Sequence, residues 1–187
     1  MSLKQSSSVL YLVALFSILS VTLPVCAQVV PSASKEQFSV TAGGMGSVFQ
    51  PDYSWSTGIG RDSRSLYGAG AYADAAFNRW LQIEVEGRWL RFNGATQFDT
   101  EDNYQAGFRF PIKRYGRFTP YGKALVGVAN ANFFSGNAFM VTVGGGVDYR
   151  LNKNFSLRAG DFEYQIWHTT PTIEPLGYSV GLGYKFF

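Results

Sequence analysis

From residue 36 onward, apolar and polar side chains alternate along the chain in segments of about ten residues. The alternation is clearest in residues 80–92, where apolar Leu81, Ile83 and Val85 are separated by polar Gln82 and Glu84. A period of two is the period of a β-strand, because successive side chains of a strand point to opposite faces of the sheet. We therefore expect eight strands, near residues 37–49, 66–77, 80–92, 103–112, 118–130, 139–151, 154–167 and 176–187.

The connections between these segments alternate in length. Those after the second, fourth and sixth segments are short, and the others are longer and rich in Gly, Ser, Asn and Thr. Short turns at one end and long loops at the other are typical of an antiparallel up-and-down barrel that crosses a membrane. An even number of strands also places the start and the end of the barrel at the short-turn end.

Two places interrupt the alternation. In the seventh segment the apolar positions change parity at Gly160 and Asp161, which predicts a β-bulge there. In the first segment Gly43, Gly44 and Gly46 blur the pattern, and we expect a second bulge among them.

The first 27 residues differ in kind from the rest. Their only charge is Lys4, residues 9–23 are nearly all apolar, and small residues flank Cys26. This pattern is typical of a secretory signal peptide, which we expect to be cut after Ala27. An uncleaved membrane anchor and a lipoprotein signal with Cys26 lipidated are the alternatives. The expected domains are thus a signal peptide at 1–27, a periplasmic N-terminal segment at 28–36 and a barrel at 37–187.

Composition and charge exclude some classes of function. The formal net charge is +3 and the chain contains no run of Lys or Arg, so we expect no binding of nucleic acid. After residue 27, no stretch approaches the roughly 18 consecutive apolar residues of a membrane helix. Any crossing of a membrane must therefore be made by strands.

The charged residues of the alternating segments lie on the polar face. Alternation by itself does not distinguish a membrane barrel, with its apolar face outside, from a lipocalin-like barrel, with its apolar face inside. The polar face carries six acidic and six basic residues, and unpaired charges in a narrow lumen are costly, so this balance favours an interior ion-pair network. The network predicted to hold the barrel together comprises Asp74, Glu84, Glu86, Arg88, Arg109, Lys123, Asp148, Arg150, Arg158, Asp161, Glu163 and Lys185.

Aromatic residues on the apolar face have the spacing of a membrane. Phe139 and Tyr149 lie ten residues apart on the same face. At about 3.3 Å per residue and a tilt near 40°, this separation spans roughly 25 Å, the height of the apolar band of a membrane barrel. The predicted aromatic girdle comprises Trp89, Phe139, Tyr149, Tyr178 and Phe186; the alternative is that these rings form the core of a soluble sandwich.

The last segment and the hairpin before it resemble a known family. Residues 176–187 alternate aromatic or aliphatic with small residues and end on Phe187, and the hairpin contains Gly-Gly-Gly-Val-Asp-Tyr-Arg at 144–150 and Phe-Ser-Leu-Arg at 155–158. This pattern resembles the small eight-stranded outer-membrane barrels of the OmpA/OmpX and opacity-protein type. The resemblance implies a transmembrane barrel in the bacterial outer membrane, in contact with its lipid and lipopolysaccharide. It also implies insertion by the barrel assembly machinery, which recognises the terminal aromatic residue.

Little in the sequence predicts chemistry. The single histidine, His168, is expected at the outer rim of the seventh strand, where lipid A hydrolases of this architecture place a His beside a Ser. Here Thr169 and Thr170 follow it, and we predict no enzyme activity. Residues 68–73 fit a dinucleotide fingerprint formally but lie inside a strand, so no cofactor is expected. No cluster of Cys and His predicts a metal site.

The long loops carry what specificity the sequence suggests. The connection at residues 50–65 contains Tyr53, Trp55, Arg61 and Arg64, a mixture suited to lipopolysaccharide phosphates or to a host or neighbouring surface. We therefore expect an outer-membrane β-barrel with a structural or surface-interaction role and without an open diffusion pore, since eight strands enclose an interior just filled by side chains. A narrow channel, a lipid A-modifying rim hydrolase and a soluble lipocalin-like periplasmic binder are the alternatives.

Overall fold

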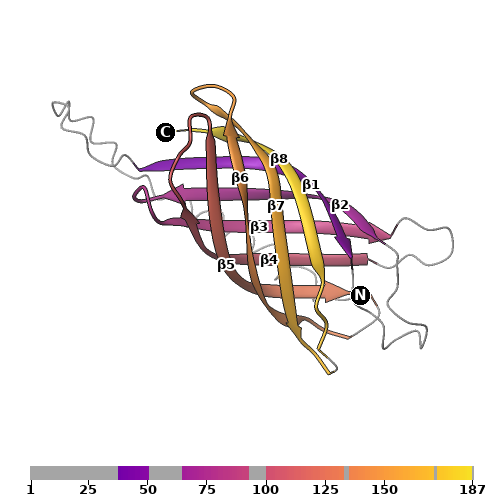
Figure 1. Cartoon of the computed structure of the whole chain (residues 1–187). Helices are drawn as coiled ribbons and strands as arrows, with labels where there is room; N and C mark the ends of the chain where they lie inside the picture. Colours follow the sequence, from indigo (N-terminus) through magenta and orange to yellow (C-terminus); the bar gives the residue numbers. More distant parts are fainter. Residues whose placement is uncertain (1–37, 51–64, 93–99, 133–134, 171, 187) are drawn as a thin grey trace, which may run out of the picture. The chain divides into compact units, whose positions relative to one another are not determined.

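The computed structural model describes residues 38–50, 65–92, 100–132, 135–170 and 172–186, whose strands form one sheet closed into a barrel (Figure 1). Each strand pairs antiparallel with the next along the chain, and β1 closes the barrel on β8. The strands are β1 (Ser39–Gln50), β2 (Leu66–Ala76), β3 (Gln82–Phe92), β4 (Thr100–Pro111), β5 (Phe118–Ala131), β6 (Ala138–Arg150), β7 (Phe155–His168) and β8 (Leu176–Lys185). The predicted eight-stranded antiparallel up-and-down barrel is therefore confirmed.

The predicted signal peptide at 1–27 and the predicted periplasmic segment at 28–36 lie outside the described residues, so both stay predictions. The same holds for the loop residues Tyr53, Trp55, Arg61 and Arg64. Among the described residues, no helix is long and apolar enough to cross a membrane.

The two ends of the barrel differ, and we name them by their connections. The turn end carries the short connections 77–81, 112–117 and 151–154, together with the first residue of β1 and the last of β8. Asparagines build two of these turns: the Asn78 side-chain oxygen accepts from two backbone N–H groups at 2.8 Å, and Asn152 does the same after β6. The loop end carries the longer connections.

The two bulge predictions have opposite outcomes. In β7 the register with β6 shifts, so that Val147 faces Gly160 while Asp148 faces Arg158, which leaves Ala159 as the extra residue. This confirms a bulge within two residues of the predicted place. The bulge predicted in β1 is wrong, because β1 keeps a continuous register with both neighbours. Gly43 is there for space: a Cβ would lie 2.3 Å from the Leu182 carbonyl oxygen and 2.7 Å from the Tyr72 ring.

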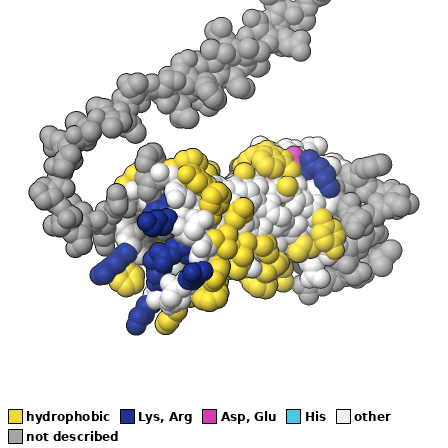
Figure 2. Space-filling model, turned by 90° about the horizontal axis from the view of Figure 1, so that it is seen from above, with side chains coloured by type: hydrophobic (Ala, Val, Ile, Leu, Met, Phe, Trp, Pro, Cys, Tyr) yellow, Lys and Arg dark blue, Asp and Glu magenta, His cyan; other side chains and the backbone are white. Residues whose placement is uncertain are grey.

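The apolar face of every strand is the outer face of the barrel. Large hydrophobic side chains such as Val85, Phe108, Val126 and Leu182 are about half exposed there, and hydrophobic side chains cover much of the barrel surface in Figure 2. Charged side chains of the strand interiors instead point into the lumen and are buried. A lipocalin-like barrel needs the opposite arrangement, with the apolar face inside, so this alternative is excluded.

Candidate functional site

The interior of the barrel is built around Glu84 on β3. Its carboxylate lies 3.3 Å from Arg109 Nε on β4, 3.2 Å from Lys123 Nζ on β5 and 3.1 Å from Arg158 Nη2 on β7. All four side chains are buried. Because inward positions recur every second residue on each strand, strands far apart in the sequence bring these charges to one level of the lumen.

Lys123 is the second centre of the network. Its ammonium group contacts Glu163, lies 2.7 Å from Asp161 and 3.5 Å from Glu86, and also pairs with Glu84. Four carboxylates from β3 and β7 thus converge on one cation. Buried carboxylates without a partner would be strongly destabilising, so this ammonium is expected to be essential for the packing of the lumen.

Arg88 completes the network toward the loop end. It donates to Glu86 at 2.8 Å on its own strand and pairs with Glu163 across the lumen. A planar guanidinium can serve two carboxylates at once because it presents five N–H donors. Arg88 therefore ties β3 to β7 across the interior.

Arginines and aromatic rings border the network toward the turn end. Arg109 pairs with Asp74 at 3.2 Å and with Asp148, so it links β2, β4 and β6. Its guanidinium lies 3.6 Å from the centre of the Tyr121 ring, and that of Arg158 lies 3.8 Å from the Tyr72 ring. These cation–π contacts stabilise the charges in place of water.

The structure brings together ten of the twelve residues that the sequence placed in the network. The other two, Arg150 and Lys185, are exposed at the turn end, and no carboxylate among the described residues pairs with them. Both residues have inward parity, Arg150 on β6 and Lys185 on β8. Each is the last residue of its strand and lies where the lumen opens at the turn end. The paired residues are therefore six acids and four bases, rather than the equal numbers that the sequence suggested.

Neutral polar residues that sequence reasoning missed extend the network. Thr142 Oγ1 donates to Gln105 Oε1 at 2.6 Å, and the Gln105 amide donates to Glu86. Gln165 donates to Glu163 at 3.2 Å and accepts from Trp167 Nε1 at 3.0 Å. These residues share the inward parity of the charges, and that parity was the signal that could have found them.

An apolar layer, which was also missed, fills the lumen at the loop end. It consists of inward-facing or loop-end side chains that are almost completely buried: Phe49, Leu66, Leu90, Ala129, Ala131, Ala138, Met140, Trp167 and Ile173. Trp167 joins this layer to the polar network through its bond to Gln165. The interior thus has two packed layers, one apolar and one ionic, and its side chains take up the cross-section of an eight-stranded barrel.

Three carboxylates in the network have the proximity of metal ligands. Oxygens of Glu84, Glu86 and Asp161 lie within 4.8 Å of one another. The Lys123 ammonium lies within 3.5 Å of all three, at the position from which a cation would contact them. The arrangement is therefore that of a salt-bridge network, and these residues do not fit a metal site.

His168 ends β7 at the loop end and faces outward. It is exposed, and its ring centre lies 5.4 Å from that of Phe139 on β6. The residues of the formal dinucleotide fingerprint, 68–73, lie within β2. Neither place has the geometry of a reactive centre.

The predicted girdle residues lie on the outer face, near one end or the other. Trp89, Phe139 and Tyr178 lie toward the loop end, and Tyr149 and Phe186 lie toward the turn end. Most of them contact rings that the sequence had not assigned: Trp89 packs edge-on to Tyr104, Tyr178 to Phe162 and Phe186 to Tyr184, with centroids 5.0–6.3 Å apart.

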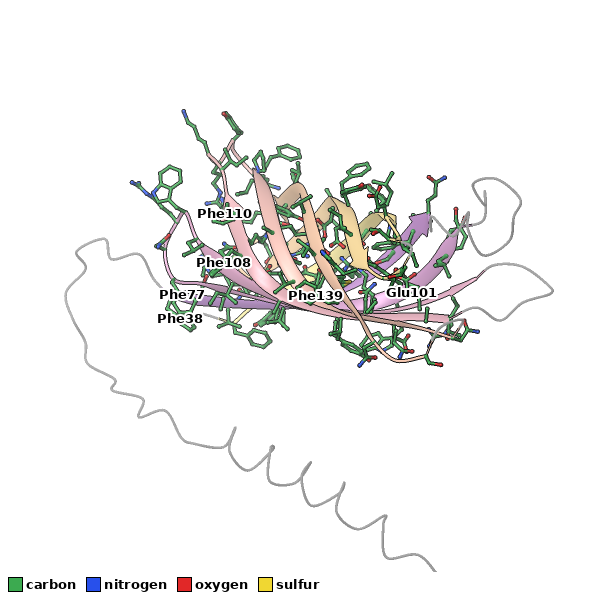
Figure 3. The ribbon with its side chains drawn as sticks, turned by 90° about the horizontal axis from the view of Figure 1, so that it is seen from below. Phe38, Phe77, Glu101, Phe108, Phe110 and Phe139 are labelled. Atoms are coloured by element: carbon green, nitrogen blue, oxygen red, sulfur yellow. The ribbon has the colours of Figure 1, made fainter. Side chains whose placement is uncertain are left out.

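Further rings join the belt at the turn end. Figure 3 shows Phe38 next to Phe77, and the centroids of their rings are 5.5 Å apart. It also shows Phe108 and Phe110 on β4. In the same view Glu101 lies toward the opposite end of β4. Aromatic belts at both ends of an apolar band are characteristic of membrane barrels.

Comparisons with known proteins agree with this geometry. Residues 14–186 match the family described as "Outer membrane protein beta-barrel domain". Among solved structures, the chain is similar to Neisserial surface protein A, with 18% identity and a TM-score of 0.59 over 80% of this chain and 97% of that one. It is also similar to the outer membrane protein OprG from Pseudomonas aeruginosa, with 13% identity and a TM-score of 0.55 over 81% of this chain and 97% of that one. No curated protein matches the chain.

Proposed function

This chain belongs to the outer membrane protein β-barrel family, and on that premise we propose that it is a closed barrel with a structural or surface-interaction role. The protein lies in the lipid of the bacterial outer membrane. In this role the protein carries out neither general diffusion nor catalysis.

The filled lumen is the observation that carries the proposal. The ion pairs around Glu84 and Lys123 and the apolar layer around Trp167 are both buried, one above the other. A water-filled pore would need a continuous polar path between the two ends, and the apolar layer interrupts it. The two packed layers of the lumen therefore serve as the core of the domain.

We also propose an orientation for the barrel in the membrane. The turn end faces the periplasm and the loop end faces outward, as is usual for bacterial barrels with short turns and long loops. The aromatic belts then lie at the two interfaces of the bilayer. The aromatic end of β8 is proposed as the segment that the barrel assembly machinery recognises.

A planar-bilayer recording tests the closed lumen. We expect the purified wild-type protein to give no stable unitary conductance, under conditions in which an open porin conducts, because both layers exclude a continuous file of water. Steady single-channel steps that scale with the amount of inserted protein would contradict the proposal and favour the narrow-channel alternative.

The surface role is proposed to involve lipopolysaccharide phosphates and the arginines of the first long loop. The double variant Arg61→Gln/Arg64→Gln should weaken binding of purified lipopolysaccharide several-fold, because charge-assisted bonds to phosphate are lost. Competitive titration of the detergent-solubilised protein measures this. The matched control is Arg91→Gln, which removes an exposed arginine paired with Asp102 at 2.8 Å at the loop end. Equal affinity of the double variant and the wild type would refute the assignment and leave a protein partner for the loop.

A further inference from the structure

The turn end of the lumen opens into a cavity that the closed network does not fill. Its volume is about 790 Å³, within the range of about 300–1,000 Å³ typical of small-molecule sites. Arg109, paired with Asp74 and Asp148, forms its floor. The ionic and apolar layers lie beyond this floor, so the cavity is a blind pocket rather than the entrance of a channel.

The pocket carries a marked excess of positive charge. Seven of its nine charged lining residues are cations, and the two carboxylates, Asp74 and Asp148, already pair with the floor arginine. The remaining six cations surround the mouth: Arg79, Lys113, Arg114, Arg150, Lys153 and Lys185. Figure 2 shows Lys and Arg side chains gathered at this end of the barrel. An excess of cations of this kind raises the local concentration of anions at the mouth.

The direction of these side chains indicates a soluble occupant. Arg150 and Lys185 have inward parity on β6 and β8 and line the cavity. The outer face at the same end carries aromatic residues such as Phe110 and Phe118. A lipid headgroup would be contacted from that outer face, whereas an anion in solution would enter through the open mouth.

Neutral groups suit the same kind of ligand. The side-chain oxygens of Asn78 and Asn152 accept backbone hydrogen bonds within their turns, which do not use the amide N–H groups of these side chains. Both residues line the cavity, as does Trp80, whose ring lies 4.9 Å from the Arg79 guanidinium. Amide donors beside cations are the groups that bind carboxylate and phosphate oxygens.

We infer that the turn-end mouth of the barrel is a binding site for a soluble organic anion with two or more carboxylate or phosphate groups. Such a ligand would reach the site from the compartment that the turn end faces. The inference goes beyond the proposed function, because it needs neither the long loops nor lipopolysaccharide.

Isothermal titration of the full chain in non-ionic detergent tests the site, with pyrophosphate and citrate as separate probes. We expect saturable one-site binding of at least one probe, and an affinity at least about tenfold lower in Arg150→Gln/Lys185→Gln, since two charge-assisted contacts to the anion are lost. The matched control, Arg91→Gln/Arg117→Gln, removes two charges from residues that do not line the cavity. It should change the affinity by less than about threefold. A heat-dependent gel shift verifies that each variant is folded.

Two outcomes would overturn the inference, and a third would reassign the site. Absence of saturable binding of either probe to the wild type would exclude the site, and equal weakening in both double variants would show general charge attraction. Repeating the titration in nanodiscs of zwitterionic lipid and of phosphatidylglycerol separates the sources of the anion. Equal affinity in both supports a soluble ligand, whereas competition by phosphatidylglycerol would identify a lipid headgroup as the occupant and refute the soluble one.

Discussion

Replacing Lys123 with methionine is expected to lower the unfolding free energy of the barrel by about 3–5 kcal/mol, because it leaves buried carboxylates without their partner. The ammonium lies 2.7 Å from Asp161 and 3.2 Å from Glu84, and it also contacts Glu86 and Glu163. Methionine has nearly the same length, so the loss is one of charge rather than of volume. Urea unfolding in lipid vesicles, followed by tryptophan fluorescence and gel mobility, measures the effect.

The network contains more acidic than basic residues, so substitutions of the two kinds should differ in their effect. Six acids and four bases form the network, so removing a cation increases the excess while neutralising an acid reduces it. Glu86→Gln should therefore lower the unfolding free energy clearly less than Lys123→Met does. Lys113→Met, at an exposed turn residue outside the network, is the matched control and should leave unfolding unchanged. Lys123→Arg keeps the charge and should still fold. If Lys123→Met unfolded at the same urea concentration as the control, the network would not stabilise the barrel.

Placing an arginine at Val126 is expected to lower the unfolding free energy by about 2–4 kcal/mol, the cost of a cation near the bilayer midplane. Val126 faces outward near the middle of β5 and is 53% exposed. Its neighbours across the sheet are Ala106 and Val141, which are apolar and carry no group to pair with a guanidinium. The same urea titration in vesicles measures the cost.

Ile112→Arg is the matched control for this prediction. Ile112 is also exposed, but it follows the last residue of β4 at the turn end, beside the aromatic belt. An arginine there can reach the interface, and the cost should be below about 1 kcal/mol. Equal costs at the two positions would show that the apolar band between the belts does not lie in the hydrocarbon core.

The strands of this barrel could be predicted because each one has apolar side chains on its outer face and polar or small side chains on its inner face, and this alternation is visible in the sequence of the strand alone. The eight segments and the short connections after the second, fourth and sixth of them followed from alternation and from the length of the intervening stretches. The bulge in β7 followed from a change of parity, which any strand that keeps one face apolar must show when it gains a residue. The bulge expected in β1 did not exist. Gly43 is there because a Cβ would meet the Leu182 carbonyl oxygen on β8 and the Tyr72 ring on β2, contacts that the sequence of β1 does not contain.

The interior was harder to predict, because parity shows which way a side chain points but not the level at which it lies. Arg150 and Asp148 have the same parity on β6, yet one faces the open mouth and the other pairs with Arg109. Likewise, Trp167 has the parity of Glu163 but packs in the apolar layer. The position along the barrel axis depends on strand tilt and on the register with neighbours, which are properties of the closed sheet.

The sequence by itself determined the number of strands, their antiparallel order and which residues of each strand share a face, since these depend on a period of two and on turn chemistry. Only the tertiary structure decided which charges meet, because the partners of Glu84 lie on β4, β5 and β7 and come together through closure of β1 on β8. Closure also produced the apolar layer at one end and the basic pocket at the other. The alternation along the sequence specifies which side chains each strand presents on each face, whereas the register of all eight strands specifies what each side chain contacts.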